Sequence, residues 1–453
     1  MNSLFLVLGH FSHYSDILRS KLIGELKKKY KIFVFTEHIN DKVAKKEGFP
    51  VDENIKYIKV SPKNPRLWKL FDAYLRLAFI REFDDWRVTK EWYYKKTHPL
   101  KTRFLISLGK IFLKKFPRAD FFSTLESILM REPNEFCKVA KIEKPLLLIS
   151  GTPGYSPLEA ELILSAKKMG IKTCAIDINY DNAYSKAKFV RKTNYISVWN
   201  GKMKKEVVNS HHYTQKKIKT VGCLRFDHYF TDPSEHILKT KIEFLKSKNM
   251  DSTKKLIIFI GPSPIMYPPR EEFISSLIRL KINKLLEGDA NILIRLHPHD
   301  VWSTYEKYFH IDGVRFERAG KQRVPDKKTK GQKIEMDKKD LLNLTETLTH
   351  ADVVIQFVST MIIEACIFDK PVISVGYPKK MMGVNNWEFN KALIDAGRLT
   401  IVKNPDELRV AINEYILHPE KNRKNRQNII KNYVQFTDGK AWKRTLDFLE
   451  EII

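Results

Sequence analysis

The stretch DVVIQFVSTMIIEACIFDKPVISVG at residues 352–376 decides the fold class. Its first part, ADVVIQF at 351–357, is a nearly continuous apolar run, typical of a parallel strand that is buried on both faces. Ser359 and Thr360 follow where a helix is expected to begin, and a second apolar run starts after Pro371. The order strand, helix, strand predicts a parallel α/β unit.

The same alternation recurs along the 453 residues. It opens with the strand SLFLVL at 3–8, a helix through LRSKLIGELKKKY and the strand KIFVFTE, and it restarts with KLIIFIG at 255–261. We therefore expect two Rossmann-like, doubly wound parallel-sheet domains, at 1–235 and 236–430, that face each other across a cleft. The charged stretch that opens the second domain is expected to contain the linker, and residues 431–453 to form a helix that returns to the first domain.

The formal net charge of +28 favours an anionic partner, such as phosphorylated substrates or an acidic membrane surface. Nucleic acid is not expected, because no zinc-finger spacing or RNP-like aromatic motif accompanies the charge. A basic helical insertion is predicted at about residues 60–120, and its segment LISLGKIFLKKF reads as a basic amphipathic helix. This helix either packs on the sheet with its basic face in water or lies on an anionic membrane. We predict a cytoplasmic protein that attaches peripherally to the inner face of the cell membrane through residues 66–116.

Several classes of protein are disfavoured by what the sequence lacks. The four cysteines are far apart and form no CxxC pair, so neither a metal site nor a disulfide framework is expected. No GxGxxG follows the first strand and no P-loop motif occurs, which argues against a dinucleotide-dependent oxidoreductase and a P-loop NTPase. The short apolar run at the N-terminus predicts a strand rather than a signal peptide, and no run of about 20 apolar residues occurs.

Glu364 is the polar residue in the opening stretch that most needs an explanation. It lies four residues after Thr360, one turn along the same helix face. A carboxylate there can accept hydrogen bonds from two vicinal hydroxyls, such as those of a ribose, while Ser359 and Thr360 at the helix start suit a phosphate. The competing interpretation is a pair of capping residues followed by a solvent-facing glutamate.

Four segments together resemble glycosyltransferases of the GT-B fold, in the branch that builds bacterial capsule, lipopolysaccharide and teichoic-acid polymers. These segments are DVVIQFVSTMIIEACIFDKPVISVGYP, IRLHPHD, SVWNGKMKKEVVNSHHYTQKKIKTVGCLRFDHY and VQFTDGKAWKRTLDFLEEI. The resemblance covers the second half of the chain and the end of the first half. It implies transfer of a sugar from a nucleotide-sugar donor to a surface-polysaccharide or lipid-linked glycan acceptor, with no metal or other cofactor.

The resemblance also implies roles for residues near the donor. Ser359 and Thr360, with Arg295 and His297 from IRLHP, would neutralise the leaving diphosphate, and Glu364 would bind the ribose. Gly261, at the end of the strand that opens the second domain, is added to the nucleotide site. UDP is the default nucleotide, and GDP and CMP donors stay open.

An inverting transfer needs a base for the acceptor hydroxyl, and GT-B enzymes commonly supply it from the loop after the first strand. That loop, GHFSHYSD, offers His13, His10 and Asp16, in our order of preference. The loop after the strand PLLLIS offers further contacts for the acceptor, and the residues concerned are Thr152, Tyr155 and Glu159. Glu159 is also an alternative base.

Relatives on the same fold differ from this sequence at identifiable places. Retaining GT-B enzymes often carry E-x7-E, but Gln356 lies eight residues before Glu364, which weakly favours an inverting enzyme. UDP-sugar 2-epimerases carry an SGG-x-x-E-E type helix start, and polyol-phosphate transferases carry an Asp-rich variant of the segment. This chain departs from both patterns. Both remain alternatives, as does a non-catalytic protein that binds anions or membranes.

Overall fold

A computed structural model of the chain forms two compact units, which we describe separately. Unit 1 comprises Met1–Asp227 and Gln435–Ile453, and unit 2 comprises His228–Val434. The structure describes residues 1–10, 13–69, 71, 100, 104, 119–177, 179–185, 193–230, 238–264, 270–322, 334–335, 337–357, 359–377 and 388–453. The expected amphipathic helix LISLGKIFLKKF and most of the basic insertion lie outside these residues.

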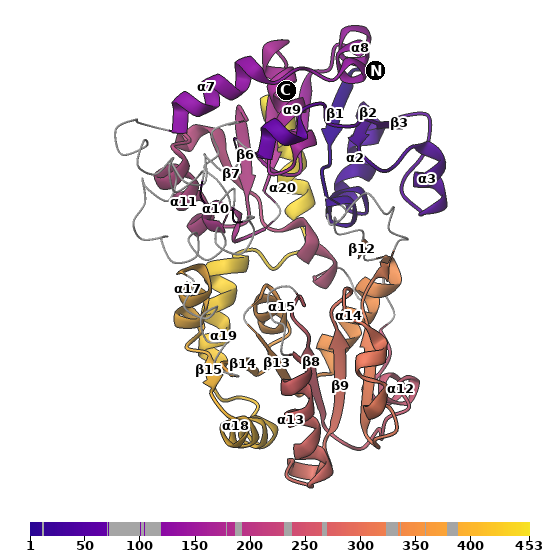
Figure 1. Ribbon diagram of the computed structural model, residues 1–453, viewed down its shortest axis with the longest axis vertical. Coiled ribbons are helices and arrows are strands. Elements are labelled where there is room, and N and C mark those ends of the chain that lie inside the picture. Colours follow the sequence, from indigo (N-terminus) through magenta and orange to yellow (C-terminus); the bar gives the residue numbers. More distant parts are fainter. Residues whose placement is uncertain are drawn as a thin grey trace. The chain divides into compact units, whose positions relative to one another are not determined.

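Unit 1 is built on a seven-stranded parallel sheet with the order β3-β2-β1-β4-β5-β6-β7 (Figure 1). The strands are β1 (Ser3–Val7), β2 (Lys31–Thr36), β3 (Ile55–Lys59), β4 (Leu147–Ser150), β5 (Lys172–Ile176), β6 (Tyr195–Val198) and β7 (Ile218–Thr220). The chain runs outward from β1 to β3 and then returns to place β4 on the other side of β1. This reversal is the switch point of a doubly wound sheet, where such folds place their ligands.

Helices cover both faces of this sheet. They are η1 (Tyr14–Leu18), α2 (Lys21–Lys29), α3 (Asp41–Lys46), α7 (Ala119–Leu129), α8 (Asn134–Glu143), α9 (Pro157–Lys168), α10 (Asn182–Ser185), α11 (Gly201–His211), η3 (Gln215–Lys217) and α20 (Ala441–Ile452). A further turn, η4 (Leu224–Tyr229), begins in unit 1 and ends in unit 2. Because α20 packs into the same core cluster as η1 and α2, the C-terminal segment completes unit 1.

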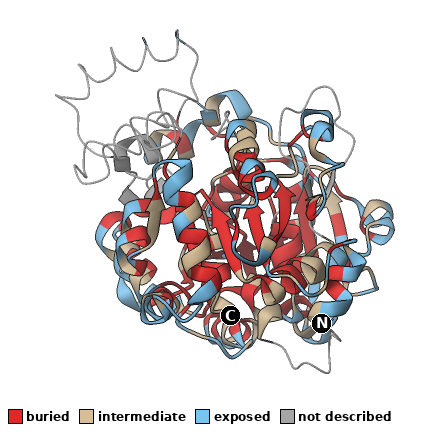
Figure 2. Ribbon diagram, turned by 90° about the horizontal axis from the view of Figure 1, so that it is seen from below, coloured by how far each residue is buried: buried red, intermediate tan, exposed pale blue. Residues whose placement is uncertain are grey.

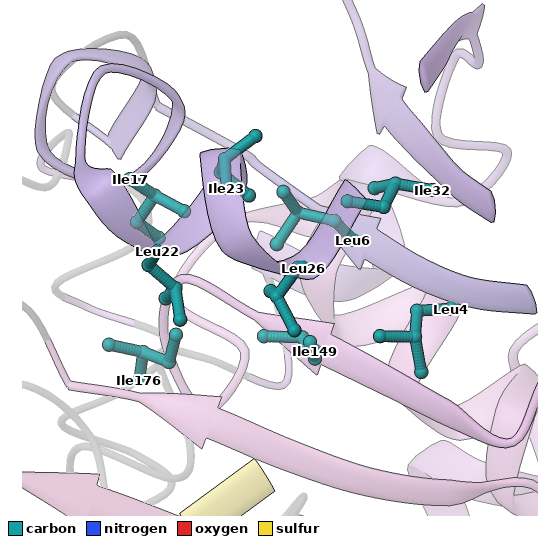
Figure 3. A pocket seen from close by; sticks show the side chains of 9 residues that line it. All are labelled: Leu4, Leu6, Ile17, Leu22, Ile23, Leu26, Ile32, Ile149 and Ile176. Atoms are coloured by element: carbon teal, nitrogen blue, oxygen red, sulfur yellow. The ribbon is translucent and has the colours of Figure 1, made fainter. Parts of the chain in front are cut away.

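The core of unit 1 on the α2 face is wholly aliphatic where helix and sheet meet. Side chains of η1 and α2 point toward those of four strands around a small void (Figure 3). The lining residues are Leu4, Leu6, Ile17, Leu22, Ile23, Leu26, Ile32, Ile149 and Ile176. A void without polar groups offers nothing to orient a substrate, so we assign it to packing.

Unit 2 repeats the architecture with a six-stranded parallel sheet, β10-β9-β8-β13-β14-β15. These strands are β8 (Leu256–Ile260), β9 (Asn291–Leu296), β10 (Val314–Arg318), β13 (Val353–Gln356), β14 (Val372–Val375) and β15 (Thr400–Val402), with a separate pair β11 (Lys321–Gln322) and β12 (Ile334–Glu335). Its α-helices are α12 (Lys241–Ser247), α13 (Arg270–Ile282), α14 (Lys338–His350), α15 (Met361–Ile367), α17 (Glu388–Gly397), α18 (Pro405–Leu417) and α19 (Arg423–Ile429). Its short turns are η6 (Glu287–Asp289), η7 (Trp302–Thr304), η8 (Glu306–Tyr308) and η10 (Ile430–Val434).

Burial follows the layers of the fold. Central strands such as β1, β9 and β13 are buried along their whole length, as the apolar runs predicted. Figure 2 shows buried strands in red among helices whose outer faces are exposed. These outer faces carry much of the Lys and Arg. The expectation of two parallel α/β domains is therefore confirmed.

The charged stretch expected to contain the linker is described from residue 238, and it holds a helix of unit 2. Its helix α12 has a capping box between Thr240 and Glu243, and Lys241 pairs with Asp352 of unit 2 at 2.6 Å. The chain passes from unit 1 to unit 2 earlier, between Asp227 and His228. Within the described part of the chain, no helix is long and apolar enough to cross a membrane.

Candidate active site

A buried histidine–carboxylate pair lies at the carboxyl ends of β1 and β4. His13 Nδ1 is 3.3 Å from Glu159 Oε1, and the two side chains are 4% and 0% exposed. The Thr152 hydroxyl donates a hydrogen bond of 2.5 Å to the other oxygen, Glu159 Oε2. We call His13, Glu159 and Thr152 the His13 cluster. A carboxylate beside one ring nitrogen orients an imidazole and stabilises the charge that it gains on taking a proton.

Local sequence places Glu159 in this cluster. Ser156 is the N-cap of α9, and its hydroxyl accepts a hydrogen bond of 3.1 Å from the backbone N–H of Glu159. Glu159 therefore lies in the first turn of α9, where the helix dipole favours a negative charge. The backbone N–H of Gly9, at the end of β1, also points to Glu159 Oε1 at 3.4 Å.

Two glycines make room for this packing. A Cβ added to Gly9 would lie 1.9 Å from Ser156 Oγ, and one added to Gly151 would lie 2.5 Å from His13 Nδ1. Neither distance is compatible with an ordinary van der Waals contact, so the loops after β1 and β4 approach closely because they lack side chains here.

The ionisation of Glu159 is set by opposing effects. Burial disfavours the charged form, but the contact with His13, the charges of His13 and His10 and the hydrogen bond from Thr152 lower the pKa of Glu159 below its ordinary value. Glu159 is therefore a carboxylate at neutral pH, as a partner for a histidine base requires.

The three bases considered from the sequence lie in different surroundings. His10 is exposed, and its ring centroid is 5.1 Å from that of His13. Asp16 is buried, which raises its pKa, while the charges of Arg225 and His13 act in the opposite direction. Asp16 also lines a small cavity with Asp177, Ser197, Arg225 and several apolar residues. His13 is held by the buried carboxylate of Glu159, which favours it as the base.

The three residues that the sequence suggested as contacts for the acceptor also lie in different surroundings. Thr152 and Glu159 bond to each other and Glu159 contacts His13, so both support His13. Tyr155 is half-buried, and its hydroxyl donates to the Asn182 carbonyl at 3.3 Å.

In unit 2, Glu364 is buried within α15 instead of facing solvent. Its side chain is 3% exposed, and Oε2 accepts a hydrogen bond from the hydroxyl of Tyr229. The interpretation of Glu364 as a solvent-facing residue is therefore wrong. A buried carboxylate needs a hydrogen-bond donor, and Tyr229 provides one for Glu364.

Ser359 and Thr360, the two polar residues before α15, do not both cap the helix. Ser359 Oγ accepts from the Met361 N–H at 3.2 Å and donates to Gln356 Oε1 at 2.9 Å. Thr360 is the N-cap residue by position, but its side chain makes no capping hydrogen bond. Ser359 thus caps the short helix, and the Thr360 hydroxyl is half-buried without that role.

The motif IRLHPHD forms a tight turn at the end of β9. The His297 N–H donates to Asp300 Oδ2 at 2.9 Å, and the Asp300 N–H donates to the His297 carbonyl at 2.8 Å. Arg270 forms an ion pair with the same carboxylate. Gly261 lies against this turn, since a Cβ on it would be 3.2 Å from the Arg295 carbonyl and 3.3 Å from the His297 nitrogen.

The charges expected of Arg295 and His297 are not free for a diphosphate. Arg295 is 4% exposed and forms an ion pair with Glu317 of β10. Burial and the charges of His299 and Arg270 lower the pKa of His297 to about 4, although the charge of Asp300 acts in the opposite direction. His297 is therefore neutral at pH 7, a correction to its expected role, and it acts on an anion only as a hydrogen-bond donor.

This low pKa predicts how stability changes with pH. Between about pH 6.5 and pH 4 the unfolded chain binds a proton at His297 that the folded chain does not, so stability falls as pH falls. In His297→Asn the amide oxygen can still accept from the His299 N–H. Between pH 7 and pH 4.5 we expect the free energy of unfolding of this variant to fall by about 2 kcal/mol less than that of the wild type. Urea unfolding at both pH values measures this. His310→Asn, at an exposed histidine, should track the wild type, and equal losses in all three proteins would refute the assignment.

Comparison with known proteins identifies the family. The model of the CDP-glycerol:poly(glycerophosphate) glycerophosphotransferase family matches residues 163–451. The chain belongs to this family. The match covers β5 to α20, including Glu364, while His13 and Glu159 precede it. Membership makes the protein a transferase in the teichoic-acid branch of the GT-B enzymes. No curated protein sequence matches the chain.

Solved structures share the fold of this glycerophosphotransferase family member over nearly its whole length. The S. aureus MnaA–UDP complex is 12% identical with a TM-score of 0.56, covering 100% of this chain and 98% of that one. The UDP-GlcNAc 2-epimerase of Neisseria meningitidis, bound to UDP-GlcNAc, is 13% identical with a TM-score of 0.56 and full coverage of both chains. A variant of the wall teichoic acid polymerase TagF soaked with CDPG is 10% identical, with a TM-score of 0.51 and coverage of 99% and 88%. At these identities the likeness establishes the GT-B fold.

Some residues of the site had no clear signal in the sequence. Tyr229 lies 135 positions from Glu364, and nothing in LRFDHY marks it as a partner. Asp300 had a signal that was missed, because an Asp three residues after a strand-end His is suited to a side-chain turn. Among the described residues, no group of three His, Cys, Asp or Glu side chains is arranged to hold a metal ion.

Proposed function

We propose that this protein transfers a polyol phosphate from a CDP-linked donor to a hydroxyl group at the end of a surface polymer. The observation that carries the proposal is the His13 cluster, a histidine held by a buried carboxylate at the switch point of unit 1. Family membership supports the chemical class of donor and acceptor. Among the alternatives left open by the sequence, membership favours the polyol-phosphate transferase, despite the absence of the Asp-rich variant.

In this proposal His13 is the general base. Its Nε2 takes the proton of the acceptor hydroxyl while Nδ1 faces Glu159. The acceptor oxygen forms a bond to the β-phosphorus of the donor, and the phosphoanhydride bond to the α-phosphate breaks. CMP leaves with the electron pair of that bond, and the polymer is one phosphodiester longer. Glu159 stabilises the imidazolium until its proton is passed on.

Unit 2 supplies the donor site in this proposal. The buried Glu364 accepts hydrogen bonds from the ribose hydroxyls, and the polar groups at the start of α15, Ser359 and Thr360, contact the diphosphate. Neutral His297 and the turn that it forms with Asp300 add hydrogen-bond donors instead of charge. These groups act where negative charge develops on the leaving phosphate.

A second candidate function is transfer of a sugar from a nucleotide sugar, as first expected from the sequence. The Glu364 carboxylate favours it equally, because a ribose is present in both donors. The two reactions differ in the bond that breaks. Attack at an anomeric carbon releases a nucleoside diphosphate, whereas attack at the β-phosphorus releases a nucleoside monophosphate.

The test follows from that difference. The purified protein is incubated with a short glycerol phosphate oligomer and either CDP-glycerol or UDP-GlcNAc, with and without EDTA, and nucleotides are separated by anion-exchange chromatography. We expect CMP to be released from CDP-glycerol only when the oligomer is present, with or without EDTA. Release of UDP from UDP-GlcNAc, with no turnover of CDP-glycerol, would replace the proposal by the sugar transfer. Dependence on a metal would correct the expectation that none is needed.

We also propose that the protein works at an anionic membrane surface on the cytoplasmic side, where a lipid-linked acceptor would be found. The net charge of +28 supports this proposal. Sedimentation with vesicles of phosphatidylglycerol, compared with phosphatidylcholine vesicles, tests it. Equal recovery with both would count against a charge-driven attachment.

A further inference from the structure

Tyr229 contacts the proposed ribose-binding helix at two points. Its hydroxyl donates a hydrogen bond to Glu364 Oε2, and its ring packs edge-on against Phe368 with centroids 5.0 Å apart. Glu364 and Phe368 are four residues apart, one turn along α15, so they present the same helix face. Tyr229 therefore lies along that face with its hydroxyl at the carboxylate.

Tyr229 lies next to the point where the chain passes from unit 1 to unit 2. It is the last residue of η4, which begins in unit 1, and it follows the passage from Asp227 to His228 by two residues. Asp227, two residues before Tyr229 in the same turn, belongs to unit 1 and accepts hydrogen bonds of 2.9 and 2.8 Å from the Ala441 and Trp442 N–H groups. The turn η4 therefore bonds to unit 1 through Asp227 and to Glu364 through Tyr229.

The hydrogen bond leaves Glu364 able to bind a ligand. A carboxylate has about four acceptor positions, so it can accept from the Tyr229 hydroxyl and from the hydroxyls of a ligand at the same time. A flexible glutamate that is held before the ligand arrives loses less conformational freedom on binding, which increases affinity.

We propose that Tyr229 is a positioning residue that preorganises Glu364 for the ribose hydroxyls of the donor and thereby links donor binding to the segment that joins the two units. The inference rests on the proposed function, because it takes Glu364 as the ribose ligand. Tyr229 acts through Glu364, so its effect depends on the glutamate being present.

A double-mutant cycle on nucleotide affinity tests this directly. The probe is CDP, measured by isothermal titration calorimetry with the full chain. We expect Tyr229→Phe, which keeps the ring against Phe368, to weaken CDP binding about fivefold to tenfold. We expect Glu364→Ala to weaken it more than thirtyfold, and the double variant to match Glu364→Ala alone, since a positioning residue has nothing left to position.

A matched control comes from the same unit. The Tyr308 hydroxyl donates to Glu271 Oε1 at 2.7 Å, another tyrosine–glutamate hydrogen bond, so Tyr308→Phe should leave CDP affinity within twofold. The wild type offers a second measurement that needs no variant. Binding of 2′-deoxy-CDP should be weaker than that of CDP, and Tyr229→Phe should reduce this difference.

The outcomes separate the inference from the proposed function. If Glu364→Ala leaves CDP affinity unchanged and the wild type binds 2′-deoxy-CDP as tightly as CDP, the donor site itself is misassigned and the proposed function loses its nucleotide ligand. If both weaken binding but Tyr229→Phe does not, or if its effect adds to that of Glu364→Ala, the positioning role of Tyr229 is overturned and the proposed function stands.

Discussion

Replacing His13 with glutamine is expected to lower kcat for CMP release about a thousandfold while CDP affinity stays within twofold. A general base contributes about 10²-fold to 10⁴-fold, and glutamine cannot accept the proton of the acceptor hydroxyl. Its amide can still fill much of the space beside Glu159, where the imidazole contact is 3.3 Å. Rates come from the chromatographic assay, and calorimetry with CDP shows that the donor site is intact.

Glu159→Gln distinguishes a base from a merely buried histidine. The Thr152 hydroxyl can still donate to the amide oxygen, but the negative charge beside His13 Nδ1 is lost. We expect kcat to fall about 10²-fold, because the imidazolium that forms is no longer stabilised. Together the two changes should cost little more than His13→Gln alone, since both act on one group.

His10→Gln tests the competing base. His10 is exposed and lies beside His13, so a larger loss from His10→Gln than from His13→Gln would move the base to His10 and reduce the His13 cluster to a structural role. The exposed His310 in unit 2 provides the matched control, and His310→Gln should leave kcat unchanged.

Gly9→Ala is expected to destabilise the protein by about 3 kcal/mol, as overpacking in a closed site does. The new Cβ would lie 1.9 Å from Ser156 Oγ and 2.6 Å from Ser156 Cβ, so either β1 or the start of α9 must move. Alanine itself is compatible with the backbone here, since Gly9 does not have a positive φ. The free energy of unfolding in urea measures the change.

A second substitution identifies the clash as the cause. Ser156→Gly removes the two nearest of the three atoms that the new Cβ would meet and leaves Glu159 Cδ at 3.1 Å. Glycine at an N-cap costs only about a few tenths of a kcal/mol relative to serine. The double variant Gly9→Ala/Ser156→Gly should therefore recover most of the lost stability. Gly24→Ala is the control, because a Cβ there meets nothing within 4 Å, and it should stabilise α2 by about 0.5 kcal/mol. Equal effects at Gly9 and Gly24 would show that the close approach is absent.

Local sequence was sufficient for the central strands of both sheets. The run at residues 3–8 predicted β1, observed as Ser3–Val7, and the run at 351–357 predicted β13, observed as Val353–Gln356. A strand that is covered on both faces needs apolar residues at every position, and this requirement is visible without knowing the neighbours. The α/β order then follows from the alternation of such runs with helical segments.

Part of the site was also visible locally. The loop after β1 and the start of α15 were singled out because polar residues follow buried strands, and His13 and Glu364 lie there. The sequence could not say that Arg295 is committed to Glu317 or that His297 is neutral. Both facts depend on which side chains surround these residues, and that environment comes from distant parts of the chain.

The sequence by itself therefore determined the strands, the helices and the chemistry available at the strand ends. Only the tertiary structure decided which of those residues meet. Because the sheet order places β4 beside β1, Glu159 comes to lie at His13 although β2, β3 and β4 all lie between them along the chain. Tyr229 reaches Glu364 in the same way, across 135 positions. The order of the strands depends on how the whole sheet is assembled. No local preference of the residues themselves therefore encodes which side chains meet.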